Sequence, residues 1–508
     1  IIMKTKNTFY NSIASLFYYF STIILGVLNR KAVILFLGIE YQGINGLFSN
    51  ILSMLSIAEL GVGTAIIFHL YGPMSKNDKF QIKALMNFYR RCYWIIAGVI
   101  LSLGLLIMPL LPLIVTDNST SYSLPILYIW FLLDSVVSYL FTYKRSILIA
   151  DQKNYVIIAC DFCYQLIVKL GQIVILWLLQ DFIIYLSLMV IFRLLENLLI
   201  NFISNRKYPY LSSNDDVYLL PQNIVEDIKK KVKGTVFHKI GSFIVLGTDN
   251  ILISRFLGLA AVGIYSNYYL IINTIKSVCS QILISATASV GHLLAEKNEN
   301  RIYQVFTEMQ IMNGLLINCA SIGIYCVATP IISFIFGNEY ILSDDTLFVL
   351  SINFYIQGMR TVYNIFKETS GILYEDRFVP VIESVINIVA SIFLLKILGL
   401  AGVFLGTILS SLILYVYTYP VLVYRRVLRQ SIRKYYLELL WGFFATVISM
   451  IIVKKTCVFF KLNNPILQIL FNSASTMLLG NSLYFVLFMS WKNERKSLYK
   501  RIKKTIRN

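Results

Sequence analysis

The sequence predicts an all-α polytopic membrane protein of about fourteen transmembrane helices, in two parallel-repeat six-helix lobes around a central cavity plus two C-terminal helices. Hydrophobic residues make up 57% of the 508-residue chain and charged residues only 14%, with a mean hydropathy of +0.70, which is too apolar for a soluble protein of this size. Runs of about 20 mainly apolar residues, long enough to cross a bilayer core as a helix, recur throughout the chain. A glycine-punctuated junction between two such runs occurs twice, which indicates an internal repeat.

The apolar runs define the expected helices in chain order. Their expected bounds are 10–36, 43–69, 92–115, 123–147, 155–179, 182–203, 236–256, 262–290, 311–336, 345–369, 378–397, 400–424, 436–457 and 465–490. The first run has no small-residue cleavage site behind it, so we expect a retained span rather than a signal peptide.

The basic residues between these runs predict the orientation in the membrane. If the N-terminus is cytoplasmic, the cytoplasmic loops carry clusters of lysine and arginine, among them Lys76, Lys79, Lys83, Arg90, Arg91, Lys144, Arg145, Arg206, Lys207, Arg425 and Arg426. The opposite loops carry acids instead, including Glu40, Asp181, Glu339, Asp344 and Asp345. Lys454, Lys455 and Lys461 disagree with this pattern. The positive-inside rule therefore predicts that both termini are cytoplasmic.

The repeated junction relates two halves of the chain. FLGIEYQGINGLFSN (36–50) and FLGLAAVGIYSNYYL (256–270) share Phe-Leu-Gly and a Gly-Ile pair five residues after that glycine. ILIADQKNYVII (147–158) and GILYEDRFVPVI (371–382) form a second correspondence. Six expected helices separate the copies, and because six is even the halves have the same orientation, as parallel repeats do. The alternative is that two glycine-rich tight turns look alike by chance.

These correspondences give the expected domains. They are an N-terminal six-helix lobe (1–205), a polar cytoplasmic linker (206–235), a C-terminal six-helix lobe (236–425), and two extra helices with a basic cytoplasmic tail (426–508).

Several ionisable residues fall inside the apolar runs, where charge is costly and usually faces a bundle interior or a water-filled cavity. The cations Arg30, Arg255, Lys276 and Arg360 fit a cavity that selects a multiply anionic headgroup such as a diphosphate, and we assign Glu59 to the same cavity. For each cation the alternative is an intramembrane ion pair or snorkelling to the interface, which is easiest for Arg255 near a helix end.

A second group of polar residues offers oxygen ligands. Asp249 in the seventh expected helix, with Glu383 and Asn387 one turn apart in the eleventh, predicts a cation-coupling site. Ordinary interhelical hydrogen bonding is the alternative, and the coupling ion is left open between Na⁺ and H⁺.

Motifs of catalysis are missing from the sequence. It contains neither a Walker A loop nor a Gly-x-Ser-x-Gly elbow, and its three histidines are too scattered for a metal motif. We therefore expect no enzyme activity, no catalytic residues, no metal and no bound cofactor. The basic loops are explained by membrane orientation and anionic lipid headgroups, so no nucleic-acid partner is expected.

Three stretches resemble a known family: LFLGIEYQGINGLFSNILSMLSIAELGVGTAIIFHLYGPMSKND (35–78), GTDNILISRFLGLAAVGIYSNYYLIINTI (247–275) and SVGHLLAEKN (289–298). They are similar to the Wzx-type polysaccharide flippases of the multidrug/oligosaccharidyl-lipid/polysaccharide transporter superfamily. The resemblance implies that the chain moves undecaprenyl-diphosphate-linked oligosaccharides between the leaflets of the bacterial cytoplasmic membrane by alternating access, before polymerisation into capsule, O-antigen or exopolysaccharide. It also implies membrane lipids, a polymerase and other polysaccharide-assembly proteins as partners.

The resemblance implies roles for particular residues. In the related lipid II flippases, cavity arginines hold the diphosphate and a sodium site lies between the seventh and eleventh helices. Arg30 matches the first-helix arginine in placement, and Asp249, Glu383 and Asn387 match the sodium ligands in helix and spacing. Glu383 stands where those relatives have an aspartate.

Three other functions are compatible with parts of the pattern. A cation-coupled drug/toxin exporter of the same superfamily shares the two lobes, but it usually stops at twelve helices and has an acidic, apolar cavity. A polysaccharide polymerase or ligase carries a large external loop, whereas no expected external loop here exceeds about fifteen residues. A scaffold without transport leaves the buried charges unexplained.

Overall fold

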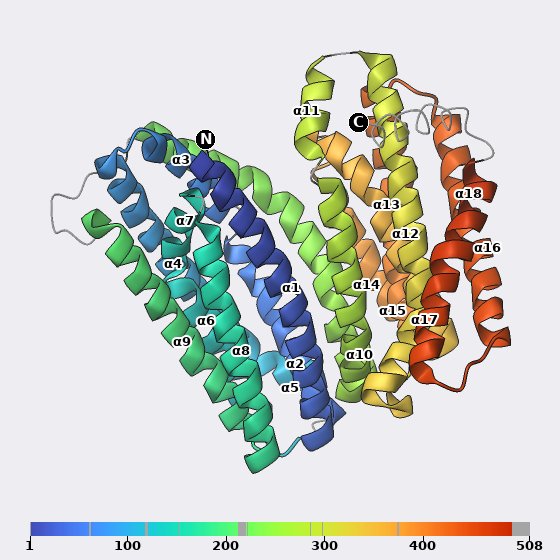
Figure 1. Ribbon diagram of the computed structural model, residues 1–508, viewed down its shortest axis with the longest axis horizontal. Helices are drawn as coiled ribbons and strands as arrows, with labels where there is room; N and C mark the ends of the chain where they lie inside the picture. The colour runs from blue at the N-terminus through green and yellow to red at the C-terminus, as the bar shows by residue number, and fades with distance from the viewer. Residues whose placement is uncertain are drawn as a thin grey trace. The chain divides into compact units, whose positions relative to one another are not determined.

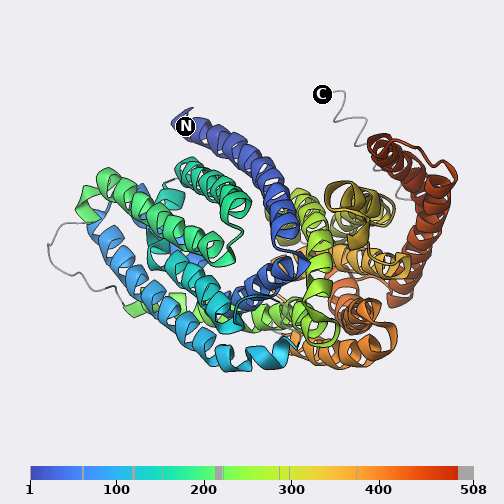
Figure 2. The same cartoon turned by 90° about the horizontal axis from the view of Figure 1, so that it is seen from below.

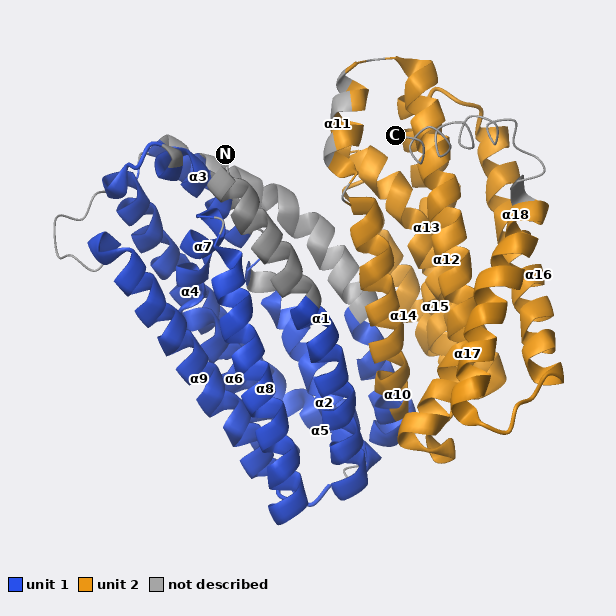
Figure 3. Ribbon diagram, in the orientation of Figure 1, with its two compact units in different colours: residues 1–263 blue, residues 264–508 orange. Residues whose placement is uncertain are grey.

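The computed structural model describes residues 2–59, 62–116, 120–151, 153–211, 220, 222–284, 286–296, 298–372 and 375–489. The regular structure of these residues is entirely helical (Figure 1), which confirms the predicted all-α class. The chain forms two compact units, residues 1–263 and residues 264–508 (Figure 3).

Unit 1 contains the helices of the first six expected spans and the start of α10. They are α1 (Ile2–Phe36), α2 (Ile39–Leu55), η1 (Ser56–Glu59), α3 (Val62–Ser75), α4 (Lys79–Ile107), η2 (Met108–Leu110), α5 (Leu111–Ile114), α6 (Leu124–Leu140), α7 (Thr142–Ala150), α8 (Asn154–Leu179), α9 (Phe182–Lys207) and η3 (Pro209–Leu211). Helix α1 packs along α8, and α9 packs against both α6 and α8 (Figures 1 and 2).

Unit 2 contains the remaining helices. They are the end of α10 (Gln222–Ile284), α11 (Thr287–Ala295), α12 (Glu299–Phe336), η4 (Asn338–Tyr340), α13 (Asp344–Thr369), α14 (Val379–Leu398), α15 (Leu400–Ile413), the π-helical η5 (Leu414–Val427), α16 (Ile432–Phe459), α17 (Pro465–Ser475), the π-helical η6 (Thr476–Gly480) and α18 (Asn481–Met489). Helix α10 crosses the boundary between the units, so residues 236–263, expected in the second lobe, are grouped with unit 1.

Each of the fourteen expected spans corresponds to a helix or to consecutive helical segments. Among the described residues, nine helices are long and apolar enough to cross a membrane, or ten if α6 and α7, bent by 43°, form one span. The expected spans 43–69, 345–369 and 465–490 are not among these helices. The protein is a multi-pass membrane protein.

Several breaks between helices have a local cause in the sequence. Asp78 accepts a hydrogen bond from the backbone N–H of Gln81 (3.0 Å), and Asp181 accepts one from Ile184 (2.9 Å), so both side chains cap the helix that follows them. Pro420 lies inside η5, where its missing N–H and its ring are incompatible with regular α-helical bonding.

The two copies of the glycine junction have the same backbone and contact each other within unit 1. Gly38 (φ 107°) and Gly258 (φ 85°) each lie between two helices in a conformation that favours glycine. A Cβ atom on Gly43 would lie 2.1 Å from the carbonyl oxygen of Leu259, and one on Gly263 would lie 2.4 Å from that of Ile39. The second glycine of each copy therefore allows the backbone of the other copy to approach.

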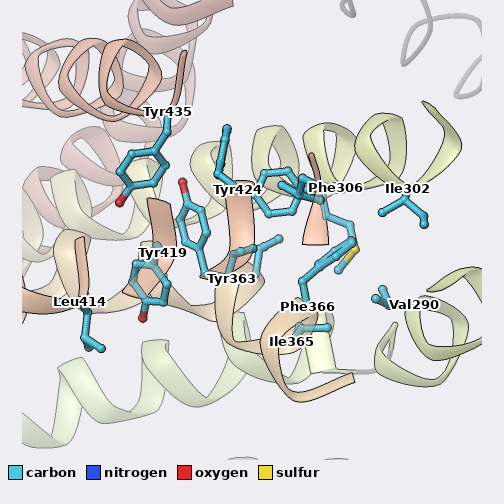
Figure 4. Packing of buried hydrophobic residues seen from close by; sticks show 14 of the residues in the cluster. Val290, Ile302, Phe306, Tyr363, Ile365, Phe366, Leu414, Tyr419, Tyr424 and Tyr435 are labelled. Atoms are coloured by element: carbon cyan, nitrogen blue, oxygen red, sulfur yellow. The ribbon is translucent and has the colours of Figure 1, made fainter. Parts of the chain in front are cut away.

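Aromatic residues fill the core of unit 2 where α12, α13, η5 and α16 meet (Figure 4). The rings of Tyr363 and Tyr419 stack with centroids 4.7 Å apart, and Tyr424 packs edge-on against both Phe306 and Tyr435. The Tyr435 hydroxyl donates to the carbonyl oxygen of Tyr415 (2.9 Å), so this buried polar group is satisfied.

One exception to the charge pattern has a local explanation. Lys454 near the end of α16 forms an ion pair with Asp344 at the start of α13, and its ammonium group lies 4.4 Å from the ring centroid of Tyr325. An acid from the loops expected outside the cell thus compensates a lysine that the positive-inside pattern does not explain.

Candidate functional site

Arg30 lies within the last two turns of α1, beside a buried hydrogen-bonded group from α8 and α9. Its neighbour Asn29 donates to Gln172 (3.1 Å) and accepts from the Tyr185 hydroxyl (2.7 Å). Lys169 of α8 donates to the same Gln172 oxygen (3.3 Å). These bonds hold α1, α8 and α9 together around Arg30.

Lys169 is a second cation at this place, because it shares the Gln172 oxygen with Asn29, the residue that precedes Arg30. It was not assigned to the site from sequence, although a lysine in the middle of the apolar run 155–179 is the signal that would have identified it. Two like charges that interact across adjacent helices form a place where an anion is favoured.

A cavity of about 290 Å³ lies in the same unit, among α1, η1, α6, α7, α8 and α9. Glu59 lies at its wall and accepts a hydrogen bond from the Tyr93 hydroxyl (3.0 Å). The structure thus places this expected site residue at a cavity, in a different group of contacts from those around Arg30.

The walls of this cavity carry a network of ion pairs. Arg145 of α7 binds Asp161 of α8 (2.6 Å) and Glu196 of α9 (2.8 Å). Arg193 of α9 binds the other oxygen of Glu196 (3.0 Å) and Asp134 of α6 (3.3 Å). Asp134, Asp161, Arg193 and Glu196 lie within the expected spans 123–147, 155–179 and 182–203, but the apolar pattern does not show which of them pair. Nor does it show the bend between α6 and α7, which precedes Arg145.

Arg360 of α13 and Glu383 of α14 form an ion pair in unit 2. Both carboxylate oxygens of Glu383 accept from the guanidinium group, at 2.8 and 3.2 Å. Gln357 (2.8 Å) and the Tyr419 hydroxyl (3.3 Å) also contact Arg360. The sequence assigned Arg360 and Glu383 to different roles, and the structure brings them together.

Lys276 is exposed near the end of α10. It lines a small cavity of about 30 Å³ together with Thr361 and Gln357, the residue that Arg360 contacts. Unit 2 therefore contains two neighbouring cations, only one of which is bound to an acid in a bidentate pair.

The remaining expected site residues lie on α10 and α14. Asp249 is buried in unit 1, and its Oδ1 has no hydrogen-bond partner among the described residues. Arg255 is exposed, and its carbonyl oxygen accepts from Thr116 at 3.5 Å. Asn387 belongs to unit 2, is buried, and donates to the Thr407 hydroxyl (3.1 Å).

A protein-family model described as "Polysaccharide biosynthesis protein" matches residues 87–345. No curated protein matches the chain.

Solved structures show the same fold at low sequence identity. The lipid II flippase MurJ in an inward closed conformation is 16% identical, with a TM-score of 0.61 over 94% of this chain and 99% of that one. An inward-facing multidrug resistance transporter of the MATE family is 13% identical, with a TM-score of 0.61 over 78% of this chain and 92% of that one. A mutant of the Vibrio cholerae MATE transporter VcmN is 14% identical, with a TM-score of 0.54 over 81% of this chain and 94% of that one.

Proposed function

Because this chain belongs to the polysaccharide biosynthesis protein family, we propose that it is a Wzx-type flippase. It translocates undecaprenyl-diphosphate-linked oligosaccharide repeat units across the bacterial cytoplasmic membrane, for capsule, O-antigen or exopolysaccharide assembly. The observation that carries the proposal is a pair of cations joined through shared glutamine contacts in each unit. In unit 1, Lys169 and Asn29, the residue before Arg30, bind the same Gln172 oxygen. In unit 2, Arg360 binds Gln357, which lines a cavity together with Lys276.

The cations bind the diphosphate in this proposal. Guanidinium and ammonium groups form short charge-assisted hydrogen bonds to phosphate oxygens, and the repulsion between neighbouring cations is relieved when an anion binds. Arg360 is already neutralised by Glu383, so phosphate oxygens must compete with that carboxylate for the guanidinium group. The exposed Arg255 is a further proposed contact for the headgroup.

The transport cycle is alternating access between two lobes, with the lipid tail left in the bilayer. The likeness in fold to a lipid II flippase supports a lipid-linked substrate. We place both termini and the linker 206–235 in the cytoplasm, and the final helices of 426–508 outside the two-lobe transport core. A polymerase and other assembly proteins then receive the translocated unit.

A cation gradient drives the cycle through Asp249, Glu383 and Asn387. The unpartnered, buried oxygen of Asp249 supports this role, since a buried acceptor without a partner is costly unless it binds something during function. Transport that continues unchanged after both the Na⁺ and the H⁺ gradients are collapsed would contradict it.

The substitution Arg30→Ala tests the diphosphate site. In a flippase-deficient strain we expect the intact chain to restore surface polysaccharide and the variant to restore less than about a tenth, because one charge-assisted contact of this kind contributes about 1.5–3 kcal/mol. The measurement is surface polysaccharide per cell at equal membrane levels of the two proteins.

Arg91→Ala is the matched control, since Arg91 is an exposed arginine that precedes the apolar part of α4. It should restore polysaccharide fully. Full rescue by Arg30→Ala would contradict the assigned role. A wild-type chain that exports organic cations and does not restore polysaccharide would instead identify a drug exporter.

A further inference from the structure

The 290 Å³ cavity of unit 1 has no role in binding the diphosphate described above. Its lining comes from six helical segments of that unit, so the bundle itself forms the cavity. Its volume is close to the lower end of the range of about 300–1,000 Å³ typical of small-molecule sites.

The charges on its walls are of both signs. Three carboxylates (Glu59, Asp161 and Glu196) and two guanidinium groups (Arg145 and Arg193) line it. A net negative lining disfavours a diphosphate, because its charge is repelled by the excess carboxylate. The Glu196 side chain is only 2% exposed, and burying such ions costs more than packing apolar residues of similar volume. Charged groups retained inside a membrane bundle are expected to serve a function.

The arrangement fits a neutral, hydroxyl-rich molecule. Sugar hydroxyls both donate and accept hydrogen bonds, so they can bind carboxylates and guanidinium groups at the same time. Tyr18, Tyr139 and Tyr164 add aromatic surface, and the Arg193 guanidinium group lies 4.1 Å from the ring centroid of Tyr164, which fixes that ring. The C–H face of a pyranose ring packs on such an aromatic surface, while its hydroxyl edge meets the charged groups.

We propose that this cavity binds a sugar ring of the lipid-linked oligosaccharide, and that it is a recognition site separate from the cations that bind the diphosphate. The inference rests on the proposed flippase function, since it assigns the sugar part of that substrate to unit 1.

The position of the cavity along α1 allows one substrate molecule to reach both the cavity and the cations at Arg30 and Lys169. Tyr18 precedes Arg30 by twelve residues, which corresponds to roughly 18 Å along a helix. Lys169 lies one helical turn after the cavity-lining Gln165 on α8, and it donates to Gln172, which also binds Asn29 beside Arg30. Polar groups on α8 thus connect the two places.

Binding to the purified full-length protein in nanodiscs tests the inference. The two probes are lipid-linked oligosaccharide extracted from the flippase-deficient strain that the chain complements, and undecaprenyl diphosphate without sugar. Tyr18→Ala and Gln165→Ala remove two cavity-lining side chains that take no part in the ion pairs. We expect each substitution to weaken binding of the oligosaccharide probe about five- to tenfold, because it removes one or two contacts. The affinity for undecaprenyl diphosphate should not change.

Arg30→Ala is the matched comparison, because it should weaken the binding of both probes. The thermal unfolding midpoint of each variant separates a lost contact from a lost fold. Equal loss for both probes, or no loss in Tyr18→Ala and Gln165→Ala, would overturn the sugar site and leave the flippase proposal intact. A wild-type protein that binds neither probe overturns both proposals. An organic cation gives a further test. If it binds the wild-type protein without displacing either probe, and Glu59→Gln abolishes its binding, then the cavity holds another ligand and the sugar site is overturned.

Discussion

Glu196 is the residue on which the charged network of unit 1 depends. Its two oxygens accept from Arg145 of α7 and Arg193 of α9, so one carboxylate compensates two cations from different helices. Asp161 and Asp134 each compensate only one of them. Removing Glu196 therefore leaves two half-buried guanidinium groups with one acid each.

We expect Glu196→Ala to lower the free energy of unfolding by about 1.5–3 kcal/mol, because each guanidinium group loses a charge-assisted hydrogen bond but keeps one acid. Glu299→Ala is the control, because Glu299 is half exposed (52%) in its pair with Arg429 and such surface pairs contribute about 0–1 kcal/mol. Thermal unfolding of the two purified variants gives the comparison. Equal midpoints would show that the network does not stabilise unit 1.

At the level of secondary-structure elements, the glycine junction sets how consecutive helices meet. Gly38 and Gly258 reverse the chain between consecutive helices, and Gly43 and Gly263 each remove the side chain that would prevent contact with the other copy. The same sequence pattern therefore performs two tasks, a turn and a close approach. Its second copy explains why a kink at Gly258 divides the 63-residue α10 into two helices.

Gly43→Val should prevent α2 from packing against the start of the helix after Gly258, since even its Cβ would lie 2.1 Å from the Leu259 oxygen. We expect little folded protein and no complementation. Gly98→Ala in α4 is the control: nothing lies within 4 Å of its added Cβ, and alanine in a helix is about 1 kcal/mol more favourable than glycine. Membrane levels and size-exclusion profiles measure both, and a well-folded Gly43→Val would contradict the packing.

At the level of the whole molecule, the orientation of the chain in the membrane is predicted from its charges. The lysine and arginine pattern predicts both termini in the cytoplasm, and the pairing of Lys454 with Asp344 removes one of its exceptions. Lys455 and Lys461 are left without a comparable explanation.

Cysteine labelling tests this orientation in the full-length chain. With its seven native cysteines replaced by serine, Asn338→Cys should react with a membrane-impermeant maleimide in intact cells, and Asn77→Cys should react only after the cells are opened. Asn77 lies between α3 and α4, where the basic residues predict a cytoplasmic loop, whereas Asn338 lies between α12 and α13, on the expected outer side. The reverse labelling pattern would invert the topology.

Much of the fold could be predicted from apolar runs, because a bilayer requires long helices with their backbone hydrogen bonds satisfied internally. Broken spans were harder to predict. Glu59 lies in η1 between α2 and α3, inside a run expected as one helix, and Pro420 lies in a π-helical segment expected as regular α-helix. Local backbone departures of this kind depend on packing against neighbouring helices, which hydropathy does not record.

The sequence predicted which residues belong to the candidate site, but it did not predict which of them contact one another. The sequence by itself determined the membrane class, and it predicted the repeat and the ionisable side chains of the apolar runs, since each follows from composition and spacing along one chain. Only the tertiary structure decided that Arg360 is held by Glu383, that Lys169 and Asn29 share Gln172 beside Arg30, and that Arg145 joins the acids of α8 and α9 at a cavity. The physical reason is that a charge inside a membrane is stabilised by partners on other helices, and those partners are set by helix packing.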